Sequence, residues 1–134
     1  MAYCLKNNKG NVLVLLCAGI FALIGFAGIC IDGSMLAYNK SKLMAATKLA
    51  AVSASSHYTV ESGSIKITAK DDIAVSVLNK NYNGASLSND KGKSFDIDGN
   101  QVTVRTKANV EFSFMKIFNL NSTTIYESYT ATRN

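Results

Sequence analysis

At 134 residues the chain has room for one folded domain and little else. Its net charge of +5 is spread thinly over lysines, and aromatic residues do not interleave with them, which argues against a nucleic-acid-binding surface. All three cysteines (Cys4, Cys17 and Cys30) lie in the first 30 residues, so the rest of the chain cannot form internal disulfides. For Cys17 and Cys30 the default interpretation is a small buried hydrophobic side chain.

The first predicted element is an uncharged apolar run, VLVLLCAGIFALIGFAGICI, at residues 12–31. A membrane core is crossed by about 20 apolar residues in a helix, so this run is long enough to span it. Because the chain contains no proline, nothing forbids one long unkinked helix here. The sequence therefore predicts a membrane-inserting helix.

The charges that flank the run predict its orientation. Lys6 and Lys9 precede it without any acidic residue, whereas Asp32 follows it directly. The positive-inside bias then places the N-terminus in the cytoplasm and the remainder outside. A removable signal peptide is the alternative, but its apolar core usually has only about 7 to 15 residues. We therefore expect residues 1–10 to remain on the mature protein as a basic cytoplasmic N-terminus.

Small residues recur along the run at spacings of three or four: Ala18, Ala22, Gly25 and Gly28. Such spacing lets the backbones of two helices approach closely, although alanine and glycine are common in any membrane helix. We interpret these positions, together with Asp32, as candidates for helix packing or assembly. In particular, Asp32 of one subunit could pair with Lys6 or Lys9 of another; the alternative is a solvated residue at the membrane boundary.

The helical pattern continues beyond Asp32. Leu36, Leu43 and Ala50 recur every seven residues with Ala46 beside them, which predicts one apolar stripe, and Thr47 is expected to lie away from it. The pattern predicts one helix over residues 11–55, with 12–31 as its membrane-spanning or fibre-core part. At about 1.5 Å per residue it would be roughly 67 Å long.

From residue 56 onward the pattern changes to that of a small α+β domain. Residues 101–115 alternate between apolar and polar side chains, which predicts a long strand with one buried face. DGNQ at 98–101 predicts a hairpin turn after a strand at 93–97, and the segments 64–69 and 123–131 are predicted strands. Residues 70–82 favour a short helix. The candidate sheet core is formed by Val102, Val104, Val110, Phe112 and Phe114.

Residues that could carry out chemistry are scarce. His57 is the only histidine, and its place at the junction of helix and sheet favours a solvated or capping role. DIDGN at 96–100 lacks the glycine and glutamate that a calcium loop would need further on. We therefore predict no catalytic residues, no cofactor, no metal site and no small-molecule substrate.

The layout resembles that of TadE/TadG-like proteins of tight-adherence (Flp) pilus systems. The resemblance lies in the start Lys9-Gly10-Asn11, the uncharged run, Asp32, the alanine-rich helix and a tail with the pattern Phe-x-x-Ile-Phe at 114–118. Pilins cut by a prepilin peptidase carry Glu five residues after the cleaved Gly, whereas this chain has Leu15 there, so it resembles the uncleaved, TadG-like type.

The resemblance implies a non-enzymatic, pilin-like structural subunit of a bacterial cell-surface filament. Its apolar helix would lie in the inner membrane before assembly and in the fibre core afterwards, with self-association or other pilus subunits as partners and an extracytoplasmic domain at 56–134. The alternative is a bitopic membrane-anchored envelope protein whose outer domain binds another protein without polymerising.

Overall fold

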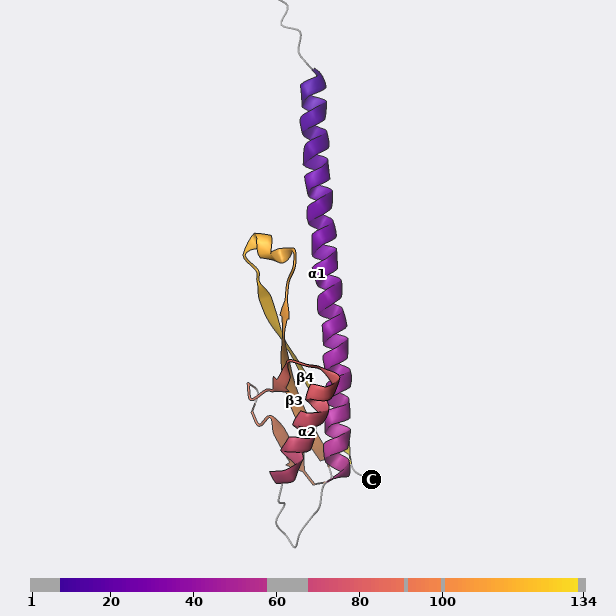
Figure 1. The fold of residues 1–134 in the computed structure, drawn as a ribbon, viewed down its shortest axis with the longest axis vertical. Coiled ribbons are helices and arrows are strands. Elements are labelled where there is room, and N and C mark those ends of the chain that lie inside the picture. Colours follow the sequence, from indigo (N-terminus) through magenta and orange to yellow (C-terminus); the bar gives the residue numbers. More distant parts are fainter. Residues whose placement is uncertain (1–7, 58–67, 91, 100, 133–134) are drawn as a thin grey trace, which may run out of the picture.

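The computed structural model describes residues 8–57, 68–90, 92–99 and 101–132, and it has an α+β fold built on one long helix (Figure 1). Helix α1 (Asn8–Ser56) has 49 residues and continues through Gly33. At about 1.5 Å per residue it is roughly 74 Å long. The predicted single helix over 11–55 is therefore confirmed, because alanine, leucine, methionine and lysine around Gly33 are strong helix formers.

The second half of the chain forms a short helix and a four-stranded antiparallel sheet. Helix α2 (Thr68–Asn81) is followed by β1 (Ala85–Leu87), β2 (Phe95–Asp98), β3 (Gln101–Glu111), the 3₁₀ turn η1 (Met115–Phe118) and β4 (Ser122–Thr132). Strand β3 is central: β4 pairs with its full length on one edge, and β1 and β2 share the other edge.

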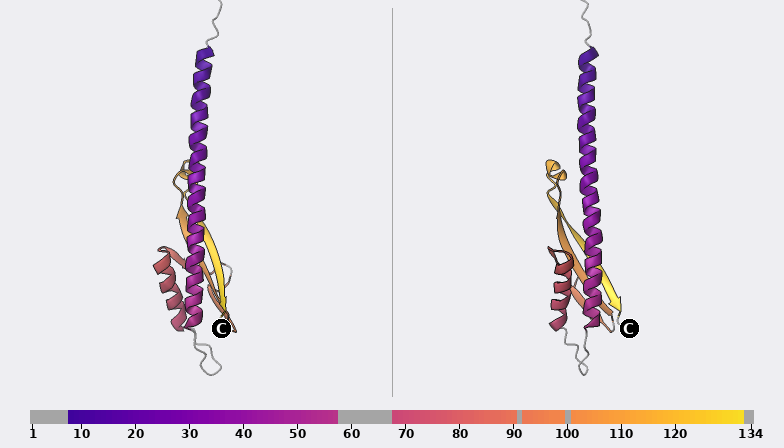
Figure 2. Two further views of the ribbon diagram at one scale, coloured as in Figure 1. Left: turned by 90° about the vertical axis from the view of Figure 1, so that its right-hand side faces the viewer. Right: turned by 45° about the vertical axis from the view of Figure 1, so that its right-hand side comes forward.

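One face of the sheet packs against the helices, and α1 runs beside β3 and β4 with α2 next to it (Figures 1 and 2). The helix side of this core is made mostly of alanines, which let the sheet approach the α1 backbone closely. The core consists of Leu43, Ala46, Ala50, Ala51 and Ala54 of α1, Ala74 and Leu78 of α2, Tyr82 just after α2, and Ala85, Phe95, Val102, Val104, Ala108, Val110, Ile125 and Ala131 of the sheet.

Several expectations from the sequence are confirmed. Leu43 is fully buried and Leu36 packs against the core from a half-buried position. The strand at 123–131 is part of β4, and the pairing of Asp98 with Gln101 closes the predicted hairpin turn, where Gly99 has a φ of +58°. The predicted short helix is α2. The Nδ1–H of His57 donates a hydrogen bond to the Ser53 carbonyl at 2.9 Å, so His57 caps the end of α1.

Other expectations were wrong. Residues 68 and 69, expected in a strand at 64–69, begin α2 instead, while 64–67 lie outside the described residues. Strand β1 was not predicted, since three residues are too few to show an alternating pattern. Thr47 is fully buried rather than off the stripe, because it lies one helical turn after Leu43.

Phe114 is also misplaced in the sequence-based core. Strand β3 ends at Glu111, so the alternation stops before Phe114, and its side chain does not join the sheet core. Val102, Val104 and Val110 lie in the core as predicted. Phe112 is buried, but it follows the end of β3 and is not part of the core cluster.

Candidate functional site

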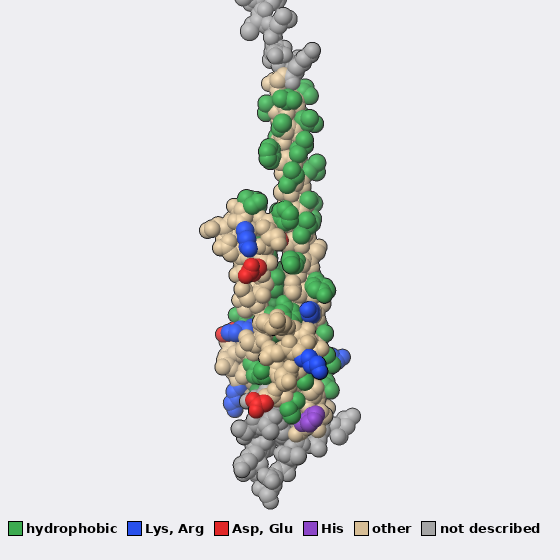
Figure 3. Space-filling model, in the orientation of Figure 1, with side chains coloured by type: hydrophobic (Ala, Val, Ile, Leu, Met, Phe, Trp, Pro, Cys, Tyr) green, Lys and Arg blue, Asp and Glu red, His purple; other side chains and the backbone are tan. Residues whose placement is uncertain are grey.

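The most prominent surface of the molecule is the N-terminal half of α1, which stands clear of the sheet (Figure 1). It is long and apolar enough to cross a membrane: an 18-residue window reaches a mean hydropathy of 2.7, and only 6% of that window is buried within the chain. Green hydrophobic side chains cover it in the space-filling view, whereas charged side chains gather around the lower half (Figure 3). Leu15, Phe21 and Leu23 are each more than 70% exposed.

Asp32 joins the end of this apolar surface to the tip of the β3–β4 hairpin. Its side chain is fully buried, and its carboxylate accepts three backbone hydrogen bonds: from the Ser113 N–H to Oδ1 at 2.9 Å, and from the N–H groups of Phe114 and Met115 to Oδ2 at 2.9 and 2.7 Å. These donors lie at the start of η1, where no backbone carbonyl is available to them. Asp32 therefore acts as the cap of a turn 81 to 83 residues further along the chain.

The environment of Asp32 keeps its carboxylate charged. Burial by itself would raise the pKa, but the hydrogen bonds from Met115, Ser113 and Phe114, aided by the positive charge of Lys116, lower the pKa below the ordinary value of 3.8. The idea of a solvated Asp32 at the membrane boundary is therefore wrong. Because the carboxylate already has three partners within its own chain, a pairing with lysines of another subunit is not needed to explain it.

Gly28 lies one helical turn before Asp32 and forms the second contact with the hairpin tip. A Cβ atom at this position would lie 2.9 Å from both Cβ and Cγ of Phe114, so only glycine fits beneath the aromatic ring. By contrast, a Cβ at Gly19, Gly25 or Gly33 would meet nothing within 4 Å. Gly28 is thus a packing residue as predicted, but its partner is the hairpin of the same chain rather than another helix.

The remaining residues that were predicted to pack against another helix have no such partner among the described residues. Ala18 and Ala22 are exposed, and Gly25 is half-buried at the edge of a groove. Lys9 lies in the first turn of α1, and Lys6 lies outside the described residues. Cys17 and Cys30 carry free, exposed thiols, so packing within the chain does not bury them as the default interpretation expected.

The groove separates α1 from the hairpin tip, has a volume of about 240 Å³ and is almost entirely apolar. Its walls are Phe21, Ile24, Gly25, Gly28 and Ile29 of α1 together with Phe114, Met115, Ile117 and Phe118 of the tip. On the tip, Ile117, Phe118 and Leu120 remain largely exposed, at 80%, 64% and 49%. The apolar surface of α1 thus continues onto the hairpin tip.

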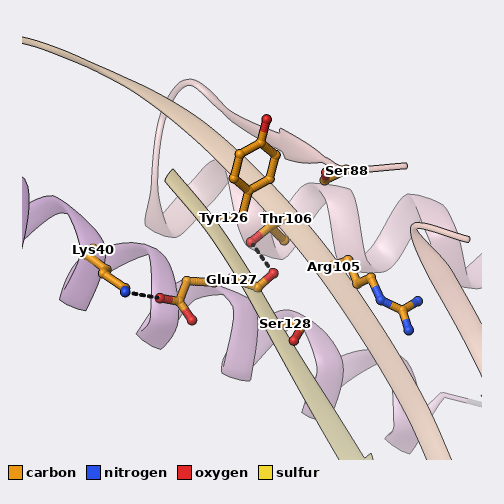
Figure 4. A pocket seen from close by; sticks show the side chains of 7 residues that line it. All are labelled: Lys40, Ser88, Arg105, Thr106, Tyr126, Glu127 and Ser128. Carbon is orange, nitrogen blue, oxygen red and sulfur yellow. Dashed lines mark hydrogen bonds and ion pairs between the residues drawn. The ribbon is translucent and has the colours of Figure 1, made fainter. Parts of the chain in front are cut away.

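A second hollow, of about 220 Å³, lies between the middle of α1 and the sheet and is polar (Figure 4). Lys40 Nζ lies 3.9 Å from the Glu127 carboxylate, and Arg105 lines the opposite part of the wall. Tyr126 also lines the hollow, and a hydrogen bond from its hydroxyl to Asp90, together with the negative charge of Asp90, raises the pKa of that hydroxyl. None of the side chains lining this hollow is a histidine or a cysteine, so it holds no nucleophile paired with an imidazole base.

Metal-binding chemistry has no support in the described part of the chain: no group of three or more His, Cys, Asp or Glu residues is placed to hold an ion. Comparisons with protein-family models, with curated proteins and with solved structures found no match for this chain.

Proposed function

We propose that this chain is a pilin-like structural subunit of a bacterial cell-surface pilus or pilus-like filament. The observation that carries the proposal is the form of α1: an apolar half that is almost entirely exposed continues, without a break, into a half that is part of the domain core. An uncovered apolar half must be covered by lipid or by other copies of the helix, since about 25 cal/mol is lost for each Å² of apolar surface left in water.

The rigid connection between the two halves favours a subunit role over a simple anchor. A membrane anchor can be joined to its outer domain by a flexible linker, whereas α1 carries the domain directly and Asp32 and Gly28 lock the hairpin against it. A fixed angle between helix and domain is what a repeating fibre needs, because the same contact must recur between successive copies.

Before assembly the apolar half would lie in the cytoplasmic membrane, with Lys6 and Lys9 inside and the α+β domain outside. The resemblance of the sequence to TadE/TadG-like proteins supports the same role, as a non-enzymatic component that is not cut after Gly10. The polar hollow beside Lys40 does not argue for catalysis, because it lacks a nucleophile–base pair.

Shearing tests the proposal. Cells that produce the full-length protein are sheared, intact cells are removed, and the amount of the chain in the medium is measured. A filament subunit leaves with the sheared material. If the chain stays entirely with the membranes, the alternative holds: a bitopic protein whose outer domain binds a partner without polymerising.

A matched pair of variants sharpens this experiment. Ala22→Phe fills one of the small positions that remain open on α1, whereas Leu23→Phe enlarges an already large side chain on a different face of the helix. We expect Ala22→Phe to reduce the sheared fraction strongly and Leu23→Phe to leave it near the wild-type level, with equal amounts of both in the membrane. Equal sheared yields would contradict assembly through this face.

A further inference from the structure

The hairpin tip overlaps the apolar half of α1 instead of stopping where it ends. The groove wall reaches up to Phe21, and Phe21 precedes Asp32 by eleven residues, or about 16 Å of helix at 1.5 Å per residue. Half of a bilayer's hydrocarbon core is about 15 Å thick. If residues 12–31 cross the membrane, the tip cannot remain in water, since it lies beside the outer half of the span (Figure 1).

From this we infer that the β3–β4 hairpin tip, residues 113–120, is a second membrane-inserted element, and that a lipid acyl chain occupies the groove between it and α1. The inference rests on the membrane-anchored stage of the proposed function, and it does not depend on polymerisation.

The side chains of the tip fit an apolar surrounding. Ile117, Phe118 and Leu120 project from it and, among the described residues outside α1, are the most exposed large apolar side chains. The one cation of η1, Lys116, has its Nζ 3.6 Å from the carboxylate of Glu111, the last residue of β3, and both side chains are exposed. A long lysine stem that leads its charge back towards water is the usual arrangement at a membrane interface.

The backbone of the tip is compatible with an apolar surrounding as well. Hydrocarbon offers no hydrogen-bond partner, so an inserted turn must satisfy its own N–H groups. The N–H groups of Ser113, Phe114 and Met115 bond to Asp32, and those of Phe112, Ile117, Asn119 and Leu120 bond to backbone carbonyls of the hairpin.

The lining of the groove is chemically complementary to an acyl chain. Its walls are hydrocarbon and aromatic side chains, it runs along α1 from Phe21 to Ile29, and it is continuous with the apolar surface that lipid would cover. The occupant is therefore a lipid tail drawn from the surrounding leaflet.

The absence of tryptophan from the chain makes a direct test possible. Three single-tryptophan variants of the full-length protein are placed in phosphatidylcholine vesicles at low protein density: Phe118→Trp on the tip, Phe21→Trp on the span and Tyr38→Trp beyond Asp32. We expect Phe118→Trp to emit at short wavelength and to be quenched by lipids with brominated tails almost as strongly as Phe21→Trp. Tyr38→Trp should emit at long wavelength with little quenching.

Three other outcomes would contradict the inference, and they can be told apart. If Phe118→Trp behaves like Tyr38→Trp while Phe21→Trp is quenched, the tip is in water and the inference is overturned, although membrane anchorage stands. If Phe118→Trp emits at short wavelength without quenching, a second copy of the chain covers the tip and lipid is not the occupant. If Phe21→Trp is not quenched either, the membrane-anchored stage fails, and the proposed function with it.

Discussion

At the scale of single residues, the hydrogen bonds of Asp32 fix the position of the hairpin tip on α1. A sequence can show that an acid follows an apolar run, and this marked Asp32 as unusual. It cannot show the partners, because these are backbone N–H groups more than 80 residues away, and every non-proline residue carries such a group. The spacing of small residues identified Gly28 as a packing residue. Its contact with Phe114 could not be predicted, because that contact depends on where the hairpin turns.

Asp32 should make stability depend on pH. Its pKa is lower in the folded protein than the ordinary value of 3.8, so the folded state binds this proton less readily than the unfolded state does. The stabilisation is then fully present above pH 3.8 and is lost as the pH falls through the folded-state pKa. We expect Asp32→Asn, in which one oxygen becomes an N–H donor, to lower the melting temperature at neutral pH and to flatten its decline in acid. Thermal melting of the detergent-solubilised protein measures both, with the exposed Asp72→Asn as control; equal pH profiles for Asp32→Asn and wild type would contradict the assignment.

Gly28 should not tolerate a methyl group. The Cβ of Gly28→Ala would lie 2.9 Å from Phe114, and overpacking of this kind costs about 1–3 kcal/mol. The gain in helix propensity from Gly to Ala, about 1 kcal/mol, offsets part of this cost. Gly33→Ala receives the same gain with open space around it. We expect Gly28→Ala to melt below and Gly33→Ala above the wild type. Adding Phe114→Ala to Gly28→Ala should then cost less than the sum of the two single changes; additive losses would show that the two residues do not press on each other.

At the scale of the elements, α1 is held to the sheet by a polar contact inside an alanine-rich interface. Thr47 donates its hydroxyl proton to the Leu43 carbonyl at 2.7 Å, so in the 2.6 Å contact between the two threonine hydroxyls Thr106 is the donor. Both side chains are fully buried. Sequence analysis found the strand and the helix that carry them, because periodicity is a local property. It did not pair the two threonines, because pairing depends on the register of β3 against α1.

This pair predicts an asymmetric mutational cycle. Thr47→Val leaves the Thr106 hydroxyl without its acceptor except for the Glu127 carbonyl at 3.5 Å, and a buried unsatisfied donor costs about 1–3 kcal/mol. Thr106→Val removes the donor itself and leaves only a spare lone pair on Thr47, so it should cost less. The double change to valine should be less destabilising than Thr47→Val alone, since both polar groups are then gone. Free energies of unfolding from denaturant titrations check this, and a double variant worse than either single one would contradict the hydrogen-bond assignment.

At the scale of the whole molecule, the sequence predicted the α+β class, the single long helix and the hairpin turn, since these follow from composition, periodicity and turn chemistry. It placed a domain boundary at residue 56, where the helical pattern ends, and one apolar stripe on the preceding helix. In the structure the core is shared: five residues of α1, from Leu43 to Ala54, are buried against α2 and the sheet. The apolar stripe through Leu43, Ala46 and Ala50 predicted that this face of α1 is buried. Local periodicity did not show that the face packs against α2 and the sheet, because these contacts join segments far apart in the chain.

The shared core predicts how the chain can be divided. A fragment of residues 28–134 keeps Gly28, Asp32 and the α1 side of the core and loses most of the apolar span, so we expect it to be soluble and to melt cooperatively. A fragment of residues 57–134 loses the whole α1 side of the core. Burial of one leucine alone contributes about 1.5–3 kcal/mol, and the four alanines add to this, against a total stability of about 5–15 kcal/mol for a domain. The shorter fragment should therefore lack a cooperative transition and show poorly dispersed amide resonances. Circular dichroism melting and amide NMR spectra of the two fragments make the comparison, and a folded 57–134 fragment would show that the sheet and α2 form a domain without α1.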